Sequence, residues 1–283
     1  MAKLMKEKKI ATPFALLHVA SLLSQRTRIQ KFAEAINRIV KQGMRVIDIG
    51  TGSGVLALLA AQAGASEVTA IDINKESIEY AQLAARMNGF EDRIRFEVKH
   101  FEEFIPDEKY DVVICEMLSS MMLIEQQIPA SSHAAKHILK PEGVMIPGSL
   151  AIYIALTECE SAWSRFCIHD LRFPKLPQTI AKEDAKDLSD LAKLASFDLV
   201  AVEESRVVEC DLNLKVVQKG VVHGLVGLFD AEVYKDIRLI PEDGWRELFL
   251  PFDKAIDVDM GDEVRVKLSF IPGQYESLSL STE

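Results

Sequence analysis

The sequence predicts an α/β protein in two domains: a parallel sheet flanked by helices over residues 1–147, then a mostly antiparallel β domain over residues 148–283. Three observations support this prediction. The length of 283 residues is sufficient for two domains, each with its own hydrophobic core. Between residues 45 and 144, short apolar strands alternate with helical stretches. After the turn pair Pro147-Gly148, strict apolar and polar alternation appears, which is typical of half-buried antiparallel strands.

Within the first domain, each expected strand is a short apolar run. The runs cover residues 45–49, 67–71, 94–98 and 110–115, and a fifth run at 144–146 follows the Pro-Glu-Gly turn at 141–143. The helix after the second strand is expected to begin at Asn74, which is a good N-cap, and to end at Asn88-Gly89, which is a good C-terminal stop.

In the second domain, residues 264–270 alternate strictly and predict a strand with one buried face. One helical interruption is expected at residues 183–196, where Leu188, Leu191 and Leu194 recur at a spacing that fits core packing.

Composition narrows the function classes. The chain has 33 basic and 43 acidic residues, a net charge of −10, which repels nucleic acid and favours a cationic partner such as a basic protein segment. No apolar run reaches the ~18 residues needed to cross a bilayer, and no signal peptide is apparent, so a cytoplasmic protein is expected. The four cysteines form no CxxC pattern, and no metal site is expected, including at His133 and His137.

A glycine turn follows the first expected strand. Residues 48–54 read Asp-Ile-Gly-Thr-Gly-Ser-Gly and lead into an apolar helix at 55–63. Such a turn lets a ligand approach the backbone, and the helix start offers unpaired N–H groups. The dinucleotide fingerprint needs its third glycine at position 55, which is Val55, whereas here it is Gly54. The spacing therefore disfavours a nicotinamide dinucleotide and leaves S-adenosylmethionine (SAM).

Two acids beside this turn favour the same cofactor. Asp48 suits the cationic aminoacyl end of SAM and would repel a pyrophosphate. Asp72 ends the second strand, where a carboxylate can accept hydrogen bonds from both ribose hydroxyls. The residues expected to bind the cofactor in this part of the chain are Asp48, Gly50, Thr51, Gly52, Gly54, Asp72 and Ile73.

The segment VIDIGTGSGVLALLAAQAGASEVTAIDIN resembles motif I and the following acidic strand of class I SAM-dependent methyltransferases. It is most similar to the protein arginine methyltransferase family, and the resemblance extends over residues 14–270. It implies a Rossmann-like, doubly wound domain followed by a β-barrel-like substrate domain, to which residues 223–233 and 244–264 are similar.

A pair of glutamates strengthens this resemblance. Glu116 directly follows the fourth strand, and Glu125 lies nine positions later, which is the spacing of the family's paired-glutamate hairpin. Two converging carboxylates can hold a guanidinium in bidentate hydrogen bonds and orient one nitrogen toward the methyl group. The resemblance implies that Glu116 and Glu125 are catalytic.

Further cofactor contacts are implied by the resemblance alone. Residues 18–36 are similar to the family's N-terminal helical region, where an arginine forms a salt bridge with the SAM carboxylate; the matching residue is Arg28. Phe101 and Glu102 match the position that holds the adenine ring, with Glu102 accepting from its exocyclic amine.

The sequence also departs from the family. Its tyrosine-rich motif is replaced at residues 11–14, its Thr-His-Trp loop reads Asp243-Gly244-Trp245, and no counterpart of its helical dimerisation arm is found. The nucleophile is therefore open: an arginine, another protein side chain such as cysteine or glutamine, or a small molecule. A SAM-binding regulator without turnover is the other reading, and the oligomeric state is open.

Overall fold

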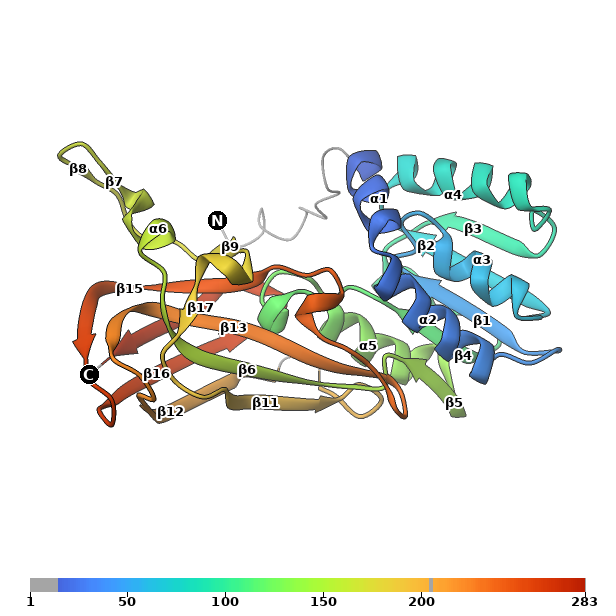
Figure 1. Ribbon diagram of the computed structural model, residues 1–283. Coiled ribbons are helices and arrows are strands. Elements are labelled where there is room, and N and C mark those ends of the chain that lie inside the picture. The colour runs from blue at the N-terminus through green and yellow to red at the C-terminus, as the bar shows by residue number, and fades with distance from the viewer. Residues whose placement is uncertain (1–14, 204–205, 283) are drawn as a thin grey trace, which may run out of the picture. The chain divides into compact units, whose positions relative to one another are not determined.

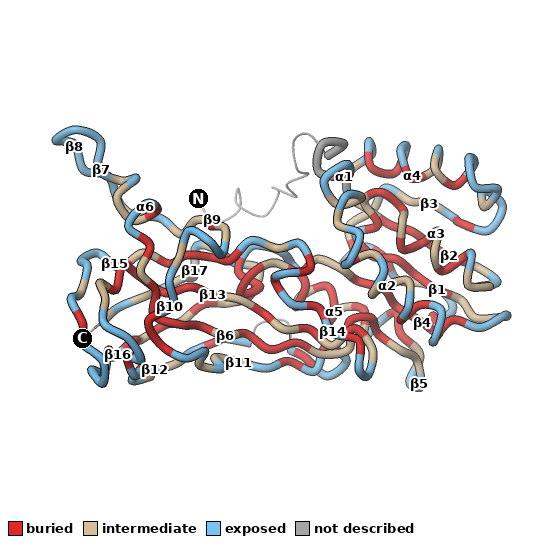
Figure 2. Tube along the Cα trace, viewed as in Figure 1, coloured by how far each residue is buried: buried red, intermediate tan, exposed pale blue. Residues whose placement is uncertain are grey.

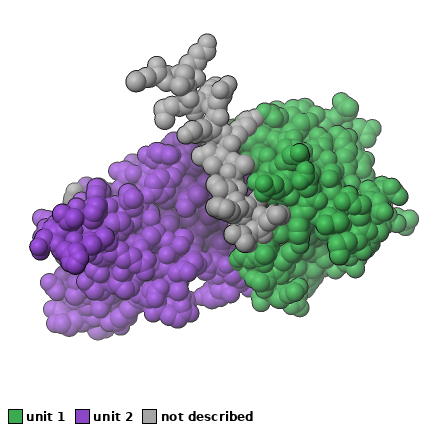
Figure 3. All heavy atoms as spheres, turned by 90° about the horizontal axis from the view of Figure 1, so that it is seen from above, with its two compact units in different colours: residues 1–116, 130–148, 233–237 green, residues 117–129, 149–232, 238–283 purple. Residues whose placement is uncertain are grey.

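The computed structural model describes residues 15–203 and 206–282, which divide into two compact units (Figure 3). The first unit contains the residues up to 116, residues 130–148 and residues 233–237; the second contains 117–129, 149–232 and 238–283. Two short segments therefore belong to a different unit from the residues that flank them. The division at 147/148 expected from the sequence stays a prediction.

The first unit is built on one parallel sheet with the strand order β3-β2-β1-β4-β5 (Figure 1). This confirms the predicted fold class. The strands are β1 (Arg45–Ile49), β2 (Glu67–Asp72), β3 (Ile94–Val98), β4 (Tyr110–Cys115) and β5 (Leu139–Ile146). The helices are α1 (Ala15–Ser24), α2 (Arg26–Ile39), α3 (Val55–Gln62), α4 (Lys75–Asn88), the short η1 (Phe101–Glu103) and α5 (Gln127–His137).

Helix α4 has the ends that the sequence predicts. The Asn74 side chain accepts hydrogen bonds from the backbone N–H groups of Glu76 and Ser77, which satisfies two donors of the first turn. At the other end Gly89 adopts φ 71°, a left-handed conformation that glycine reaches without steric cost. Both caps are local, so they could be predicted from the residues alone.

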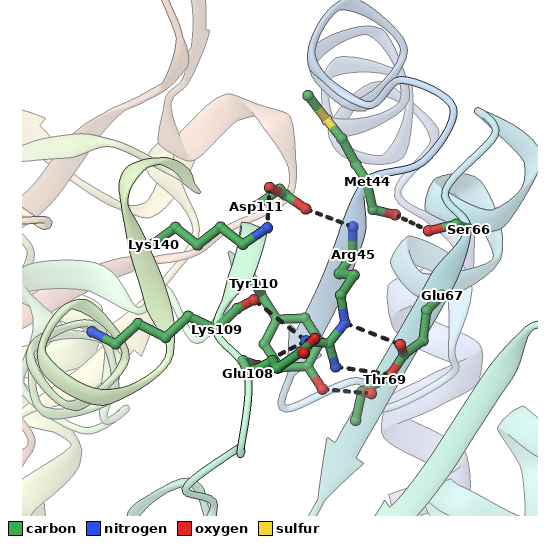
Figure 4. A network of polar contacts seen from close by, with 10 residues as sticks. All are labelled: Met44, Arg45, Ser66, Glu67, Thr69, Glu108, Lys109, Tyr110, Asp111 and Lys140. Carbon is green, nitrogen blue, oxygen red and sulfur yellow. Dashed lines mark hydrogen bonds and ion pairs between the residues drawn. The ribbon is translucent and has the colours of Figure 1, made fainter.

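The amino-terminal edge of this sheet is closed by a network of ion pairs and hydrogen bonds (Figure 4). Arg45, the first residue of β1, donates to both carboxylate oxygens of Glu67 (3.0 and 3.2 Å) and pairs with Glu108 (3.2 Å). Its guanidinium carbon lies 4.8 Å from the centre of the Tyr110 ring, and its backbone N–H donates to Asp111 (2.8 Å). Each acid at this edge is therefore matched by a cation or a backbone donor.

Residues 233–237 join the last part of β13 (Gly220–Tyr234) to β14 (Ile237–Leu239) and belong to the first unit. There Asp236 accepts a hydrogen bond of 2.6 Å from Arg38 of α2. A late part of the chain thus completes a unit formed mostly by early residues.

The second unit is antiparallel, as predicted. Its larger sheet has the order β10-β6-β13-β15-β9, with β11 also pairing with β6 and β14 with β13; a three-stranded sheet has the order β12-β16-β17. Its strands are β6 (Ser149–Glu158), β7 (Cys167–Ile168), β8 (Leu171–Arg172), β9 (Gln178–Ile180), β10 (Lys186–Asp187), β11 (Ala192–Asp198), β12 (Val208–Lys215), β13, β14, β15 (Glu247–Val258), β16 (Glu263–Ile271) and β17 (Gln274–Thr282). Its short helices are η2 (Ser120–Met122), α6 (Glu160–Trp163), η3 (Ser164–Phe166), η4 (Lys182–Asp184) and η5 (Pro241–Asp243).

The helix expected at residues 183–196 is wrong. This stretch contains the end of η4, then β10 and β11, both of which pair with β6. Of the three leucines, Leu188 is buried while Leu191 is 51% exposed, so they do not form one core-facing stripe. Pairing with β6 determined the structure here, and a leucine spacing over a short window does not exclude strands.

Burial follows the strands in both units (Figure 2). In the parallel sheet, Val46, Ile47, Val112 and Val113 have no exposed surface, because parallel strands covered by helices are buried on both faces. In the second unit, β16 alternates from Glu263 onward between buried residues and residues that are exposed or half-buried. Among the described residues, no helix is long and apolar enough to span a membrane.

Candidate active site

Four strands of the first unit end at one edge of the sheet. Ile49 at the end of β1 is in register with Ile71 of β2 and with Cys115 of β4, and Asp72 is in register with Val98 of β3. Strands β1 and β4 are neighbours although β2 and β3 lie between them in the sequence, so this edge contains the point where the strand order reverses. Open parallel sheets bind ligands at that point, outside the carboxyl ends of their strands.

The glycine turn between β1 and α3 is held against the end of β2. The N–H groups of Gly50 and Thr51 both donate to the carbonyl of Ile71 (2.9 and 3.0 Å). Gly54 has φ 78°, and a Cβ atom there would lie 2.8 Å from the Cβ of Ala81 in α4. Only glycine fits this position, because any side chain would meet both an unfavourable backbone angle and a packed helix.

Asp48 lies beneath the turn and is 1% exposed. One of its carboxylate oxygens accepts from the Thr51 hydroxyl (2.6 Å) and from the backbone N–H of Ala57 in α3 (3.1 Å). Burial raises the pKa of the Asp48 carboxyl to about 7, although both hydrogen bonds oppose this shift. Asp48 thus orders the turn internally, and the contact with a cationic cofactor group expected from the sequence stays a prediction.

Asp72 connects the turn to the next strand. Its carboxylate accepts from the N–H of Gly52 (2.9 Å) and from the N–H of Asn74 (2.8 Å). Burial raises the pKa of Asp72, and these backbone donors counteract that shift. The side chain is oriented by main-chain groups rather than by a cation, and the adjacent Ile73 is 36% exposed.

The candidate adenine position follows β3. Phe101 begins η1 and is 6% exposed, and its ring centre lies 4.3 Å from that of His100 and 6.0 Å from that of His133. His100 caps η1 by accepting from the N–H of Glu102 (3.3 Å), while the Glu102 side chain is 54% exposed. The acid that the resemblance assigns to the exocyclic amine is therefore accessible.

Arg28 and Glu116 form an ion pair. Both side chains are largely buried, at 10% and 9% exposure, and Arg28 also donates to Gln25 (2.8 Å). The resemblance implies separate roles for these two residues, one toward the cofactor and one toward the substrate. Their pairing satisfies two buried charges, which would otherwise be strongly unfavourable.

Glu125 belongs to the second unit, in the segment 117–129, which we call the connecting segment. Its backbone N–H donates to the hydroxyl of Ser119 (3.3 Å), and the N–H of Met117 donates to the side chain of Gln127 (2.8 Å), which closes the segment into a loop. The approach of Glu125 to Glu116 stays a prediction.

The connecting segment is fixed by buried methionines with unusual backbone angles. Met121 and Met122 have no exposed surface and adopt φ 61° and 54°. Angles of this kind are uncommon for residues other than glycine. A Cβ on Gly227 of β13 would lie 2.0 Å from the Met121 sulfur, so Gly227 makes room for this side chain. The strained loop is therefore supported by tight packing within the second unit.

Sequence reasoning missed three supporting residues, Gln25, His100 and Gln127. Gln25 lies three positions before Arg28 at the start of a helix, and this spacing could have suggested the contact. His100 precedes η1 as a cap. No local signal indicates Gln127, because its partner lies across a loop.

Comparisons with known proteins agree with this geometry. The model of the family described as ribosomal protein L11 methyltransferase (PrmA) matches residues 30–149. Protein arginine N-methyltransferase 1 of Dictyostelium discoideum is 24% identical over 89% of this chain and 80% of its own length. Arginine N(omega)-methyltransferase of Streptomyces achromogenes subsp. streptozoticus is 26% identical over 88% of this chain and 75% of its own length.

Two solved structures have the same fold. The PRMT1 enzyme–prozyme heterotetrameric complex of Trypanosoma brucei with AdoHcy matches with a TM-score of 0.77 and 21% identity, and covers 93% of this chain and 96% of that chain. Protein arginine methyltransferase 10 of Arabidopsis thaliana matches with a TM-score of 0.73 and 20% identity. The match covers 89% of this chain and 87% of that chain. Both matches extend over the parallel sheet and the antiparallel unit.

Proposed function

We propose that this chain, a class I SAM-dependent methyltransferase related to the protein arginine N-methyltransferases, transfers a methyl group from SAM to a guanidinium nitrogen of a protein arginine. One observation supports this above the others. The glycine turn follows β1 and Glu116 follows β4, and these two strands are neighbours that end in register. A cofactor on the turn and a cation on Glu116 would therefore occupy adjacent places at one edge.

The residues at this edge fit the cofactor. Gly52 has a positive φ angle, and a Cβ there would meet nothing nearer than 3.9 Å, so a ligand can lie close to the turn at this residue. Asp72 is held by backbone donors at the position for a ribose, and Arg28 is the cation for a carboxylate. When bound, SAM supplies a methyl group on a positively charged sulfur.

The protein's own contribution is charge and alignment. Glu116 and Glu125 would accept hydrogen bonds from two guanidinium nitrogens, which fixes the plane of the group and concentrates its positive charge there. The third nitrogen would then be free to attack the methyl carbon, in line with the S–CH3 bond that breaks. Most of the rate enhancement is expected from proximity and charge placement, and the proton leaves during or after transfer.

The Arg28–Glu116 ion pair links the proposed cofactor site to the proposed substrate site. A cofactor carboxylate would compete with Glu116 for the guanidinium of Arg28. Its binding would therefore free Glu116 to accept hydrogen bonds from the substrate. We therefore expect cofactor binding to strengthen substrate binding, with the substrate strengthening cofactor binding by the same factor.

The decisive experiment uses Glu116→Gln and Glu125→Gln, with Glu91→Gln, an exposed acid before β3, as the matched control. Formation of S-adenosylhomocysteine is measured with labelled SAM and cell extract, and SAM affinity is measured by calorimetry. Both active-site variants are expected to lose at least ~1,000-fold in turnover while binding SAM within a few-fold of the parent. Full turnover by both variants would disprove these roles. A parent that binds SAM but never releases S-adenosylhomocysteine would be a regulator.

A small guanidinium compound is the second candidate substrate. One relative is named as an arginine N(omega)-methyltransferase, without reference to protein. In addition, the loop Asp243-Gly244-Trp245 has no histidine. Amino-acid analysis of the labelled product, made once with cell extract and once with free arginine, separates these substrates and also detects methylated cysteine or glutamine.

A further inference from the structure

Gln127, the first residue of α5, is a buried amide next to the proposed site. It has no exposed surface, although Glu125 and Gln126 just before it are exposed. Its side-chain oxygen Oε1 accepts a hydrogen bond of 2.8 Å from the backbone N–H of Met117. Burying a polar side chain is unfavourable unless its hydrogen bonds are made. The contact with Met117 is therefore a physical reason for a glutamine at this position.

The N–H that donates to Gln127 belongs to the peptide group between Glu116 and Met117. Strand β4 ends at Cys115, which pairs with Ile49 of β1, so the sheet no longer dictates the orientation of this next peptide group. A hydrogen bond is strong only when the N–H points toward its acceptor. The bond to Gln127 therefore fixes the plane of the peptide group and restricts the backbone angle ψ of Glu116.

The acceptor stands on a regular element. Helix α5 extends from Gln127 to His137, and Ile128, next to Gln127, is fully buried. Pro129 fits the first turn, because the N–H groups of that turn have no acceptor within the helix. A side chain at the start of a packed helix has a well-defined position. Gln127 can therefore hold a loop residue that lies ten positions earlier in the sequence.

Glu116 is consequently restrained at two places. Its carboxylate pairs with Arg28, and the peptide group that follows it is bound by Gln127. A cofactor carboxylate that engages Arg28 would remove the first restraint and leave the second. An amide also accepts a hydrogen bond without adding a negative charge beside the two glutamates.

We propose that Gln127 is a positioning residue: by fixing the peptide group after Glu116, it keeps the Glu116 carboxylate oriented once the cofactor has engaged Arg28. This inference rests on the proposed function and deepens it, because it adds a residue that acts through Glu116 without touching the substrate. Misplacing a reacting group by about 1 Å can lower a rate on the order of 100-fold. A single hydrogen bond of this kind can therefore control turnover.

Two substitutions of Gln127 separate the acceptor from the bulk of the side chain. Gln127→Met keeps the length and removes the acceptor, and we expect it to lower kcat about 30-fold with the KM for SAM changed less than threefold. Gln127→Glu keeps an acceptor oxygen at the same reach and should lower kcat less than tenfold.

Ser189→Ala is the matched control for these variants. The Ser189 hydroxyl accepts from the backbone N–H of Leu156 (2.9 Å), which is a buried bond of the same kind in the second unit. Like Gln127→Met, it should lower the melting temperature, because a backbone N–H loses its acceptor. Its kcat should stay within twofold of the parent, so a general loss of stability would not explain the effect at Gln127.

Two further measurements locate the effect at Glu116. Hydrogen exchange of the Met117 amide, followed with S-adenosylhomocysteine bound, tests the restraint without turnover: Gln127→Met should speed it at least about tenfold, and Ser189→Ala should not. In a Glu116→Gln background, Gln127→Met should lower turnover less than threefold further, because both changes act on one group. A full additional loss would show that Gln127 acts elsewhere and would overturn the inference.

Unchanged exchange at Met117, or faster exchange with unchanged kcat, would also overturn it. The two proposals can fail separately. A parent that methylates no guanidinium, while exchange at Met117 and turnover of whichever nucleophile the labelled product identifies both respond to Gln127→Met, would refute the proposed function alone. Normal methylation of arginine by Gln127→Met would refute the positioning role alone.

Discussion

The two edges of the parallel sheet treat their acidic side chains differently. At the amino-terminal edge, Glu67 and Glu108 are paired with the guanidinium of Arg45. At the carboxyl-terminal edge, Glu116 is paired with Arg28, but Asp48 and Asp72 accept only from a hydroxyl and from backbone N–H groups, none of which has a full positive charge. At the first edge the acids have cationic partners, whereas at the second edge Asp48 and Asp72 have only neutral donors among the described residues.

From this difference we predict that acids at the first edge hold the fold and that acids at the second edge also bind a ligand. A substitution at the amino-terminal edge should change stability and leave ligand binding alone. At the carboxyl-terminal edge, replacement of a charge should weaken ligand binding and can raise stability, since natural sites often retain unfavourable groups for function.

The largest expected effect comes from Asp48→Asn. The Asp48 pKa of about 7 exceeds the unfolded value near 3.8, so unfolding releases a proton between these pH values. The free energy of unfolding therefore falls as pH rises from about 4 to about 7 and is level above that, with a total penalty of about 4 kcal/mol. The variant should lose this decline and be more stable at pH 8, while binding SAM more weakly. Denaturant titrations at several pH values measure the free energy of unfolding. The prediction is contradicted if this free energy depends on pH in the same way in both proteins.

Gly54→Ala should have the next largest effect. The new methyl group would meet Ala81 at 2.8 Å on a backbone with φ 78°, which we expect to destabilise the chain by roughly 3 kcal/mol and to weaken SAM binding. Gly43→Ala is the control, because Gly43 has φ 91° but open space around it, and it should cost roughly 1 kcal/mol with SAM affinity unchanged. Equal effects of the two variants on SAM affinity would show that the turn is not a cofactor site.

The smallest effect is expected at the amino-terminal edge. Arg45→Met removes the pairs with Glu67 and Glu108 but keeps an apolar chain against Tyr110, and should lower the free energy of unfolding by ~1 kcal/mol. Calorimetry should find SAM affinity unchanged. A clear loss of affinity would mean that the two edges are not functionally distinct.

Much of the first unit could be predicted because its signals are local. The strands at 45–49, 94–98 and 110–115 have the predicted bounds, and helix α4 has the predicted caps. Apolar runs between turn residues indicate buried parallel strands, and caps depend on a few neighbouring residues. The placement of the glycine turn after β1 follows from the same local order.

The features that could not be predicted depend on contacts between residues far apart in the sequence. Residues 183–196 form strands because they hydrogen-bond with β6. The Arg28–Glu116 pair joins two residues that come together only in the folded chain. The burial of Glu247 could not be predicted either, because a glutamate is ordinarily a surface residue and this one pairs with Ile180 of β9.

Vectorial synthesis imposes an order on this architecture. Arg38 leaves the ribosome long before Asp236, its partner in the loop between β13 and β14. The intervening residues after position 148 take on the order of 5–20 s to translate, at ~5–20 residues per second. During that interval the nascent parallel sheet lacks residues 233–237, so its last contacts form only when most of the antiparallel unit has also emerged. A fragment that stops at residue 148 should therefore be less stable than the same residues in the finished chain.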